Sequence, residues 1–537
     1  MASSEPRAEG ASTEQASPHA SPLDEAEALA RSGAGGADAP LHDSVGRGAR
    51  NGEPYVGGRG GGNQLGGRGL WARIGIGLVG IALAGATVWA VETAPLPHYA
   101  ISPSALVLSP APGDQQRVCP GPLTLLGQSS ANPTAVGYKG YAEIVTAGNT
   151  DDLDISGIAP AVEAPASAPE PTEDAIGVPA YYQAPGVVGD RATILAISQS
   201  SAATEPGAAG FSATACTPAS ADQWLVGGST AGGASTVLTL ANPTEATATV
   251  RVSLYGLEGG LPAPGLDGIE VPAGTQVAVS LEGVAPEQAA FVAHLTTRGS
   301  VIGAALHEVG LEGLQPQGAE VISSSPSPSS RLDFVGVPFP TTAADPDEAM
   351  FGTRGAVLRL FAPGDGAAAV TITLRDGSGE ALEPISLTLA PGVVSDVPLG
   401  EAPAGRYTVT VDGDSPVVAS LRTSLVAEPF DFGWYQPSPP LDGATAIAVA
   451  PGPQPRLQLS TVGTIPVTVT LVHPDGTPER VTLQPRQTTE LDVAAGAYRI
   501  DGMLQTVAQV TYDGPGQMSG VPVVGGSPLA ADVTVYR

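Results

Sequence analysis

An internal repeat in the C-terminal half of the chain is the feature that most constrains its fold. Three similar segments begin with VLTLANPTEATATVRVSLYGLEG at Val237, VLRLFAPGDGAAAVTITLRDGSGE at Val357 and LQLSTVGTIPVTVTLVHPDGTPE at Leu457. Each continues into a matching second half, at Ile269, Ile385 and Val481. The equivalent leucines at 240, 360 and 459 are 120 and 99 residues apart. This spacing is too long for solenoid repeats and predicts tandem domains.

Within each repeat, apolar residues alternate with polar ones. The apolar positions that we expect to be buried are Val250, Val252 and Leu254, then Val370, Ile372 and Leu374, and finally Val467, Val469 and Leu471. A period of two with β-branched residues is typical of half-buried strands. Asp376-Gly377 and Asp475-Gly476 occupy equivalent positions and predict hairpin turns, in which glycine supplies a positive φ.

These patterns predict a mainly β fold of tandem antiparallel β-sandwiches, of the immunoglobulin or fibronectin type. The expected sandwich domains are residues 224–330, 331–436 and 437–537, after a first β-rich region at 113–223. The repeats contain no cysteine and so lack the cysteine–tryptophan core of antibody domains. Because propeller blades are shorter, four-stranded units, we expect a short rod of domains.

A second constraint is the apolar stretch at residues 70–91, LWARIGIGLVGIALAGATVWAV. Residues 74–91 carry no charge. A helix of about 18 residues covers roughly 27 Å, close to the ~30 Å hydrocarbon core of a bilayer. Trp71 and Trp89 lie near the ends of the stretch, where aromatic rings prefer the membrane interface. We therefore expect a single N-terminal transmembrane helix.

The flanking charges predict the orientation of this helix. Arg59, Arg68 and Arg73 precede it, and positively charged flanks stay in the cytoplasm. Residues 1–69 are then a disordered cytoplasmic tail and 92–112 a proline-punctuated spacer. The rest of the chain is expected to lie outside the plasma membrane as the large part of a single-pass protein. A cleaved signal peptide is the alternative, although its leader would be very long.

The composition also limits the function. The chain contains 70 glycines and 52 prolines, which is too many for a helical protein, and its net charge is −30. A surface this acidic repels nucleic acid, so we expect no nucleic-acid partner. The sequence contains no zinc-ligand spacing, phosphate-binding loop or nucleophile elbow. We therefore expect no cofactor.

The chain has two cysteines, Cys119 and Cys216, both in the part predicted to lie outside the membrane. An even number of cysteines in an oxidising compartment predicts a disulfide. The loop that it closes is long, so it would stabilise the fold by ~4–5 kcal/mol in the chain-entropy model. A pair of buried free thiols is the alternative.

Short segments after the apolar stretch carry a family resemblance. They are VCPGP at Val118, ACTP at Ala215, WLVGGST at Trp224 and LANP at Leu240. With the N-terminal span, they resemble an uncharacterised family of membrane-anchored extracytoplasmic proteins from high-GC Gram-positive bacteria. The resemblance covers residues 70–537 and implies the topology given above. It also implies a cell-envelope component linked to glycan assembly, and it assigns no catalytic residue.

Other motifs have simpler interpretations than a functional site. Asp152, Asp154, Ser156 and Glu163 match part of the spacing of an EF-hand loop. Pro160 interrupts the loop, and the following residues are rich in alanine and proline where a helix is needed. We interpret this segment as an acidic turn and expect no metal site.

The polar and aromatic residues of the strands give few candidates. His294, His307 and Glu308 are interpreted as half-exposed strand residues, and no catalytic residue is predicted. Four aromatic residues are the candidates for a binding patch, if they are exposed: Tyr181, Tyr182, Trp434 and Tyr435. Packing in turns or between domains is the alternative role for these four side chains.

Two classes of function agree with these features. The first is a non-enzymatic cell-envelope protein that binds or scaffolds a partner, such as another envelope protein or a glycan. The second is an extracytoplasmic enzyme, for example one acting on envelope glycan. Only 6 histidines and 4 tryptophans occur in the chain. This scarcity favours the first class, because sugar-cleaving clefts usually stack sugars on aromatic rings.

Overall fold

The computed structural model divides the chain into Met1–Ile101 and Ser102–Arg537. The residues that it describes are 79–80, 82–83, 105–108, 113–126, 136–150, 152–161, 175–186, 193–205, 207–340, 355–426, 428–525 and 533–536. The predicted tail at 1–69 lies outside these residues, as do most of the predicted span at 70–91 and spacer at 92–112. Within the described residues we find no helix with the length and apolar character that a membrane crossing requires.

The described part of Ser102–Arg537 is built mainly from antiparallel strands, which form four consecutive groups, here called modules 1 to 4. Module 1 contains β2 (Gln115–Cys119), β5 (Ala142–Gly148), β6 (Asp154–Gly157), β8 (Ala175–Ile176), β9 (Ala180–Ala184), β10 (Leu195–Glu205) and β11 (Ala208–Ala215). Module 2 contains β12 (Asp222–Val226), β13 (Ala234–Ala241), β14 (Ala248–Gly256), β15 (Gly259–Leu261), β16 (Asp267–Val271), β17 (Thr275–Ser280), β18 (Phe291–Arg298), β19 (Gly303–Glu312) and β20 (Gln315–Ser323).

The last two modules follow the same order of strands. Module 3 contains β21 (Ser329–Phe339), β22 (Ala356–Phe361), β23 (Ala368–Asp376), β24 (Ile385–Leu389), β25 (Val394–Pro398), β26 (Gly405–Ser424) and β27 (Phe432–Tyr435). Module 4 contains β28 (Leu441–Val449), β29 (Arg456–Thr461), β30 (Val467–Val472), β31 (Pro478–Leu483), β32 (Thr488–Asp492), β33 (Gly496–Gly514) and β34 (Gln517–Pro522).

One pairing scheme recurs in the modules. In module 3, one set of neighbours is β21–β26–β23–β24 and the other is β25–β22–β26–β27, so the long strand β26 runs through both sheets. In module 4, β33 plays the same part. In module 2 this strand is divided into β18 and β19, and in module 1 into β9 and β10. Residues 113–216 are therefore a fourth copy of the repeat, which the sequence pattern did not predict.

Smaller strands extend this framework. The hairpin of β3 (Leu123–Leu126) and β4 (Val136–Lys139) is inserted between β2 and β5. The short strand β7 (Ala159–Pro160) pairs in parallel with β17, which links module 1 to module 2. Near the two ends of the unit, β1 (Ala105–Leu108) pairs with β35 (Val533–Tyr536).

The alternating residues form the cores of modules 2, 3 and 4, as the sequence predicts. The expected positions are all buried: Val250, Val252, Leu254, Val370, Ile372, Leu374, Val467, Val469 and Leu471. In module 3 the core lies between the two sheets that share β26, with apolar residues from β21, β22, β23 and β26. The bend of β26 from one sheet into the other gives the module the form of a half-barrel.

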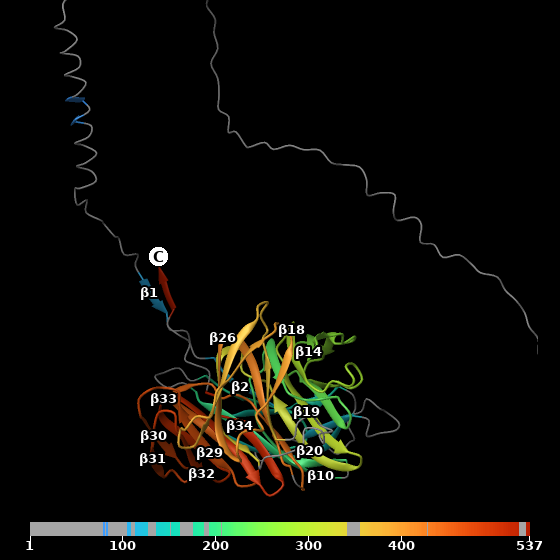
Figure 1. Cartoon of the computed structure of the whole chain (residues 1–537). Coiled ribbons are helices and arrows are strands. Elements are labelled where there is room, and N and C mark those ends of the chain that lie inside the picture. The colour runs from blue at the N-terminus through green and yellow to red at the C-terminus, as the bar shows by residue number, and fades with distance from the viewer. Residues whose placement is uncertain are drawn as a thin grey trace, which may run out of the picture. The chain divides into compact units, whose positions relative to one another are not determined.

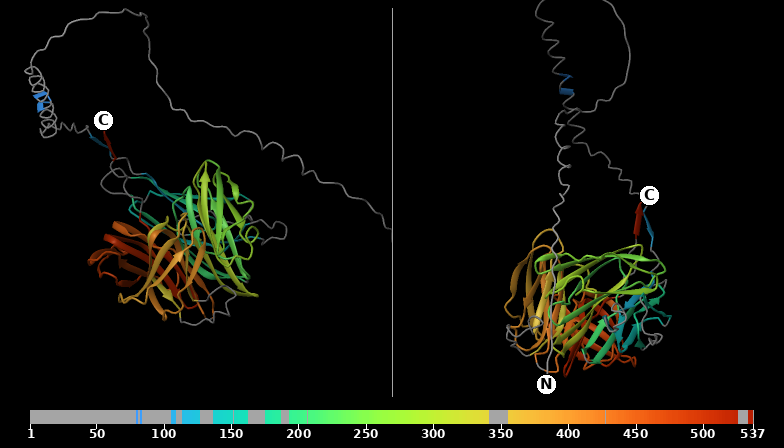
Figure 2. Two further views of the ribbon diagram at one scale, coloured as in Figure 1. Left: turned by 45° about the horizontal axis from the view of Figure 1, so that its top comes forward. Right: turned by 90° about the vertical axis from the view of Figure 1, so that its right-hand side faces the viewer.

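The modules are arranged in a ring, not in a row. The last strands of the modules, β11, β20, β27 and β34, contact one another in turn, and β34 returns to β11. Figures 1 and 2 show the modules gathered side by side in one body. The predicted rod is therefore wrong, and the sheets have a propeller-like arrangement. The error arose because strand periodicity specifies the inside of each module but not which modules touch.

We expect truncation of the equivalent core residues to be destabilising. Ile372→Ala or Val469→Ala removes a fully buried side chain and leaves a cavity, so the free energy of unfolding should fall by about 1–4 kcal/mol. Urea denaturation of the purified protein measures this change. The neighbouring exposed position provides the control, since Thr468→Ala should change stability by less than about 0.5 kcal/mol. Equal stability of all three variants would contradict the assigned core.

Candidate functional site

The centre of the ring contains a buried carboxylate that contacts all four modules. Backbone N–H groups of Phe211 in β11 and Met518 in β34 each donate to Asp431 Oδ2 at 3.1 Å. The amides of Phe432 in β27 and Ala319 in β20 also favour the ionised form of Asp431. Burial nevertheless outweighs these donors and raises the pKa of Asp431 well above its usual value. Asp431 thus fastens the four central strands together.

Glycine leaves room for this carboxylate. A Cβ added at Gly210 in β11 would lie 2.8 Å from Asp431 Oδ1 and 2.3 Å from the backbone nitrogen of Ala319. Gly318 in β20 has a positive φ of 128°, and a Cβ there would lie 2.9 Å from the same oxygen. Both strands therefore need glycine to approach the axis this closely.

A second carboxylate, Glu320 of β20, joins the same strands. Its Oε1 accepts from Ser212 Oγ of β11 at 2.6 Å, and its Oε2 accepts from Ser519 Oγ of β34 at 2.9 Å. The backbone N–H of Trp434 in β27 lies 3.4 Å from Oε2. Burial raises the pKa of Glu320 well above its usual value, and the charge of Asp431 adds to this increase. The hydrogen bonds from Ser212 and Ser519 lower the pKa but do not offset the increase. Both carboxylates therefore serve to hold the ring together.

Buried charges also connect modules 2 and 3. Arg359 in β22 donates to both oxygens of Asp396, at 2.8 and 2.9 Å, and to the Gly228 carbonyl at 2.7 Å. Its guanidinium lies 4.9 Å from the centre of the Trp434 ring. The Trp434 indole N–H donates to Glu308 Oε2 at 2.7 Å. Burial raises the pKa of Glu308, opposed by the positive charge of Arg422. These contacts tie module 2 to module 3.

Of the two strand histidines, His294 is partly exposed, as the sequence suggested, whereas His307 is not. His307 is fully buried in β19, where its Nδ1 accepts from the backbone N–H of Thr124 at 3.1 Å and its Nε2 lies 3.2 Å from Thr239 Oγ1. His294 stacks on Trp224 with ring centres 4.0 Å apart. The inserted β3–β4 hairpin covers His307, and the strand pattern could not reveal this cover.

His307 predicts a loss of stability in acid. Burial lowers its pKa to about 3, whereas the unfolded chain binds a proton near pH 6.5. As pH falls from about 6.5 towards about 3, the unfolded state gains this proton first, so His307 lowers the free energy of unfolding by up to roughly 1.4 kcal/mol per pH unit. Urea denaturation from pH 7 to 4.5 should show a smaller acid loss for His307→Gln than for the wild type. Parallel pH profiles would contradict the prediction.

The predicted aromatic patch does not form. Tyr182, Trp434 and Tyr435 are buried, and only Tyr181 is partly accessible. Trp434 and Tyr435 lie in β27 at the centre of the ring, while both tyrosines of β9 belong to module 1. The alternative role, packing between domains, describes Trp434 and Tyr435, because β27 packs against β20 and β34. Tyr182 instead belongs to the core of module 1.

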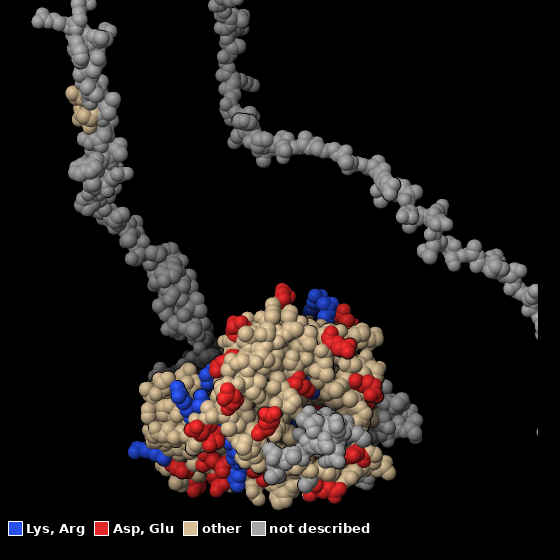
Figure 3. Space-filling view, viewed as in Figure 1, with Lys and Arg blue, Asp and Glu red and all other residues tan. Residues whose placement is uncertain are grey.

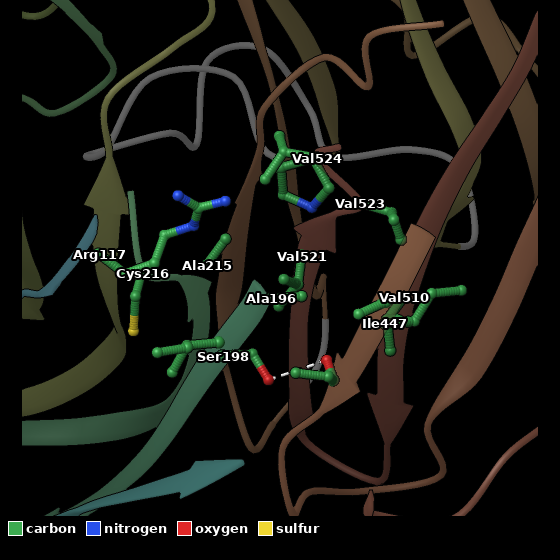
Figure 4. Close-up of a pocket in the computed structure, with 14 residues that line it drawn as sticks. Arg117, Ala196, Ser198, Ala215, Cys216, Ile447, Val510, Val521, Val523 and Val524 are labelled. Atoms are coloured by element: carbon green, nitrogen blue, oxygen red, sulfur yellow. Dashed lines mark hydrogen bonds between the residues drawn. The ribbon is translucent and has the colours of Figure 1, made fainter. Parts of the chain in front are cut away.

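Cys119 and Cys216 are joined by a disulfide, and both are buried. Nearby Arg117 lines a small cavity of about 20 Å³ between modules 1 and 4, drawn in Figure 4. Its guanidinium donates to the carbonyls of Gln116 and Leu195 at 2.9 Å, and burial lowers its pKa to about 10. This space is about the size of one water molecule, so it is too small for an organic ligand.

A larger polar groove lies between modules 3 and 4, with a volume of about 260 Å³. We call it the arginine–threonine groove. Its floor is the outward face of β21, β26 and β23, and its wall is residues 460–464 with Arg486. The charged and hydroxyl side chains that line it are Arg331, Asp333, Thr373, Arg375, Thr408, Thr410, Asp412, Ser460, Thr461, Thr464 and Arg486.

The strand register explains why these floor residues meet. Thr373 lies opposite Thr410, and Thr410 lies opposite Asp333 on the other side of β26. Arg375 lies opposite Thr408 in the same way. These are the polar positions that alternate with the buried core residues, so the pleat places them together on the outer face. The sequence contained this signal in TITLRD of β23, but not the partners on β21 and β26.

Contacts between the modules fix the wall of the groove. The backbone N–H of Thr488 donates to the Gly377 carbonyl at 3.2 Å, and Thr488 Oγ1 lies 2.7 Å from Thr408 Oγ1. Arg375 Nη1 donates to the Gly379 carbonyl at 3.2 Å, beside the backbone of Arg486. The groove is therefore held open by hydrogen bonds, not by loose packing.

The charges of the groove are only partly neutralised. Arg331 forms hydrogen bonds of 2.9 Å to both oxygens of Asp333 and lies 3.4 Å from Asp412. Burial alone would lower the pKa of Arg331, but Asp333 and Asp412 raise it. Neither Arg375 nor Arg486 forms an ion pair within the part of the chain described here. Figure 3 shows acidic side chains scattered over the visible face, with a smaller number of lysine and arginine side chains among them.

No match was found between this sequence and the curated proteins. A protein family defined as a family of unknown function, DUF5719, matches residues 174–494. The match begins before β8 and ends after β32, so it includes most of the ring. It also includes every residue that lines the arginine–threonine groove except Val507. It covers more than half of the chain, and the chain therefore belongs to the DUF5719 family of unknown function.

Proposed function

We propose that this protein is a membrane-anchored component of the cell envelope that binds or scaffolds a partner without catalysing a reaction. The arginine–threonine groove is the observation that carries the binding role, because Arg375 and Arg486 line it without forming an ion pair within the described chain. The partner is an envelope protein or a glycan.

The location is part of the same proposal. The uncharged residues 74–91 and the preceding arginines support a retained N-terminal span, with the tail in the cytoplasm and the ring outside the plasma membrane. A disulfide between Cys119 and Cys216 agrees with an oxidising compartment. We also propose that the modules are variants of the immunoglobulin or fibronectin sandwich, and that the host is a high-GC Gram-positive bacterium.

The alternative is an extracytoplasmic enzyme that acts on envelope glycan. A glycosidase needs two carboxyl groups on either side of a bound sugar. Glu308, Glu320 and Asp431 are buried and hydrogen-bonded to protein groups, so they are poorly placed for this chemistry. Asp333 and Asp412 face the groove, but both are paired with Arg331. These placements favour binding over catalysis.

Protease added to intact spheroplasts tests the location. With tags at both ends, we expect removal of the C-terminal tag and protection of the tag at residue 1. Chemical cross-linking on whole cells, followed by purification, should then recover an envelope protein or glycan in the wild type. The Arg375→Gln/Arg486→Gln double variant should recover less of it. A protected C-terminal tag would contradict the location, and equal recovery would contradict the groove as the binding surface.

A further inference from the structure

The lining of the arginine–threonine groove limits the chemistry of its ligand. Hydroxyl groups of threonine and serine predominate, and within the described residues no aromatic side chain lines the groove. The hydroxyls of Thr408, Thr410, Ser460 and Thr461 already bond protein groups and offer a ligand their remaining acceptor capacity. The ligand is therefore held by hydrogen bonds, not by stacking or apolar burial. A molecule with many hydroxyl groups, such as a sugar, offers both the donors and the acceptors that such a surface needs.

The arginines add a requirement for negative charge. The groove contains three arginines and two aspartates, and Arg331 already engages both aspartates. This leaves Arg486, and the part of the Arg375 guanidinium that is not bonded to the Gly379 carbonyl, for an anion on the ligand. A planar guanidinium binds a carboxylate or a phosphate through two parallel hydrogen bonds.

The acidic remainder of the protein sets an upper limit on that charge. The net charge of −30 repels those parts of a polyanion that extend beyond the groove. Salt screens charges that lie more than about 8–10 Å away, so a single anionic group inside the groove interacts mainly with the nearby arginines. Resting on the proposed binding function, we infer that the groove binds a glycan unit that carries one carboxylate or phosphate group.

The experiment uses the full-length protein in detergent micelles, studied by isothermal titration calorimetry at low and high salt. The probes are glucuronic acid, glucose 1-phosphate and uncharged glucose. We expect saturable binding of at least one anionic sugar, at least tenfold tighter than that of glucose and weaker in high salt. The first two probes distinguish a carboxylate-bearing from a phosphate-bearing ligand.

Variants locate the binding. The Arg375→Gln/Arg486→Gln double variant should weaken binding of the anionic sugar at least tenfold. It should shift the unfolding midpoint in urea only slightly, because it removes one hydrogen bond, from Arg375 to the Gly379 carbonyl. Arg251→Gln is the matched control, because Arg251 is exposed, pairs with Asp267 in module 2 and lies outside the groove. It should bind as the wild type does.

The inference is overturned if neither anionic sugar binds saturably, if glucose binds as tightly, or if the double variant keeps the wild-type affinity. These results differ from a failure of the proposed function. If the C-terminal domain proves external and its cross-linked partner is still lost in the Arg375→Gln/Arg486→Gln double variant, the groove stays a binding surface. Only this class of ligand is then rejected.

Discussion

Glu320→Ala should lower the free energy of unfolding by about 3–5 kcal/mol. The substitution removes the acceptor of the Ser212 hydroxyl and the Trp434 backbone N–H, and each buried donor left without a partner costs about 1–3 kcal/mol. The cavity left by the side chain adds to this cost. Urea denaturation at pH 7 measures the change.

Two further variants separate the role of the carboxylate from general sensitivity to mutation. Glu320→Gln keeps the volume and one acceptor oxygen, so its loss of stability should be smaller than that of Glu320→Ala. Glu258→Ala removes an exposed carboxylate from the turn after β14 and should change stability by less than about 0.5 kcal/mol. Wild-type stability of Glu320→Ala would show that the central carboxylate does not hold the four strands.

Loss of the disulfide should have an effect of similar size. The bond joins residues separated by 97 positions. In the chain-entropy model, opening a loop of about 100 residues costs about 4–5 kcal/mol, because the unfolded chain becomes freer. The Cys119→Ser/Cys216→Ser double variant should therefore unfold at a much lower urea concentration than the oxidised wild type.

Reducing agent provides the control for this prediction. It should shift the unfolding of the wild type towards that of the double variant and leave the double variant unchanged. Non-reducing peptide mapping should recover the two cysteines in one linked fragment. Two thiols that react with an alkylating agent in the native protein would contradict the bond.

The sequence was most informative about burial where the pattern within a single strand is enough to predict it. Ile372 and Val469 were predicted to be buried because alternation within a single strand is enough to place them, and they are buried. Turns were less predictable. Gly476 has the expected positive φ. In the equivalent turn of module 3 the positive φ was expected at Gly377 but occurs at Gly379. There the Asp376 side chain accepts hydrogen bonds from the amides of Ser378 and Glu380, which gives the turn a different shape.

The ring could not be predicted from strand patterns. Its contacts depend on Asp431 in a connecting segment and on glycines that allow close approach, and neither has a periodic signal. Module 1 escaped recognition because β6 and β8 are short. The groove was missed for a related reason, since Arg331, Arg375 and Arg486 come from separate parts of modules 3 and 4.

Closure of the ring constrains the order in which the protein matures. Ser519 Oγ accepts from the backbone N–H of Ala213 at 2.9 Å, although 306 positions separate the two residues. Individual modules have local strand pairings and can collapse as they leave the ribosome. The two central carboxylates, however, acquire their donors from β34 only after nearly the whole chain has emerged. Until then the surface of β11 that packs against β34 stays uncovered, so delayed delivery of the last module leaves a half-assembled intermediate that is prone to aggregate.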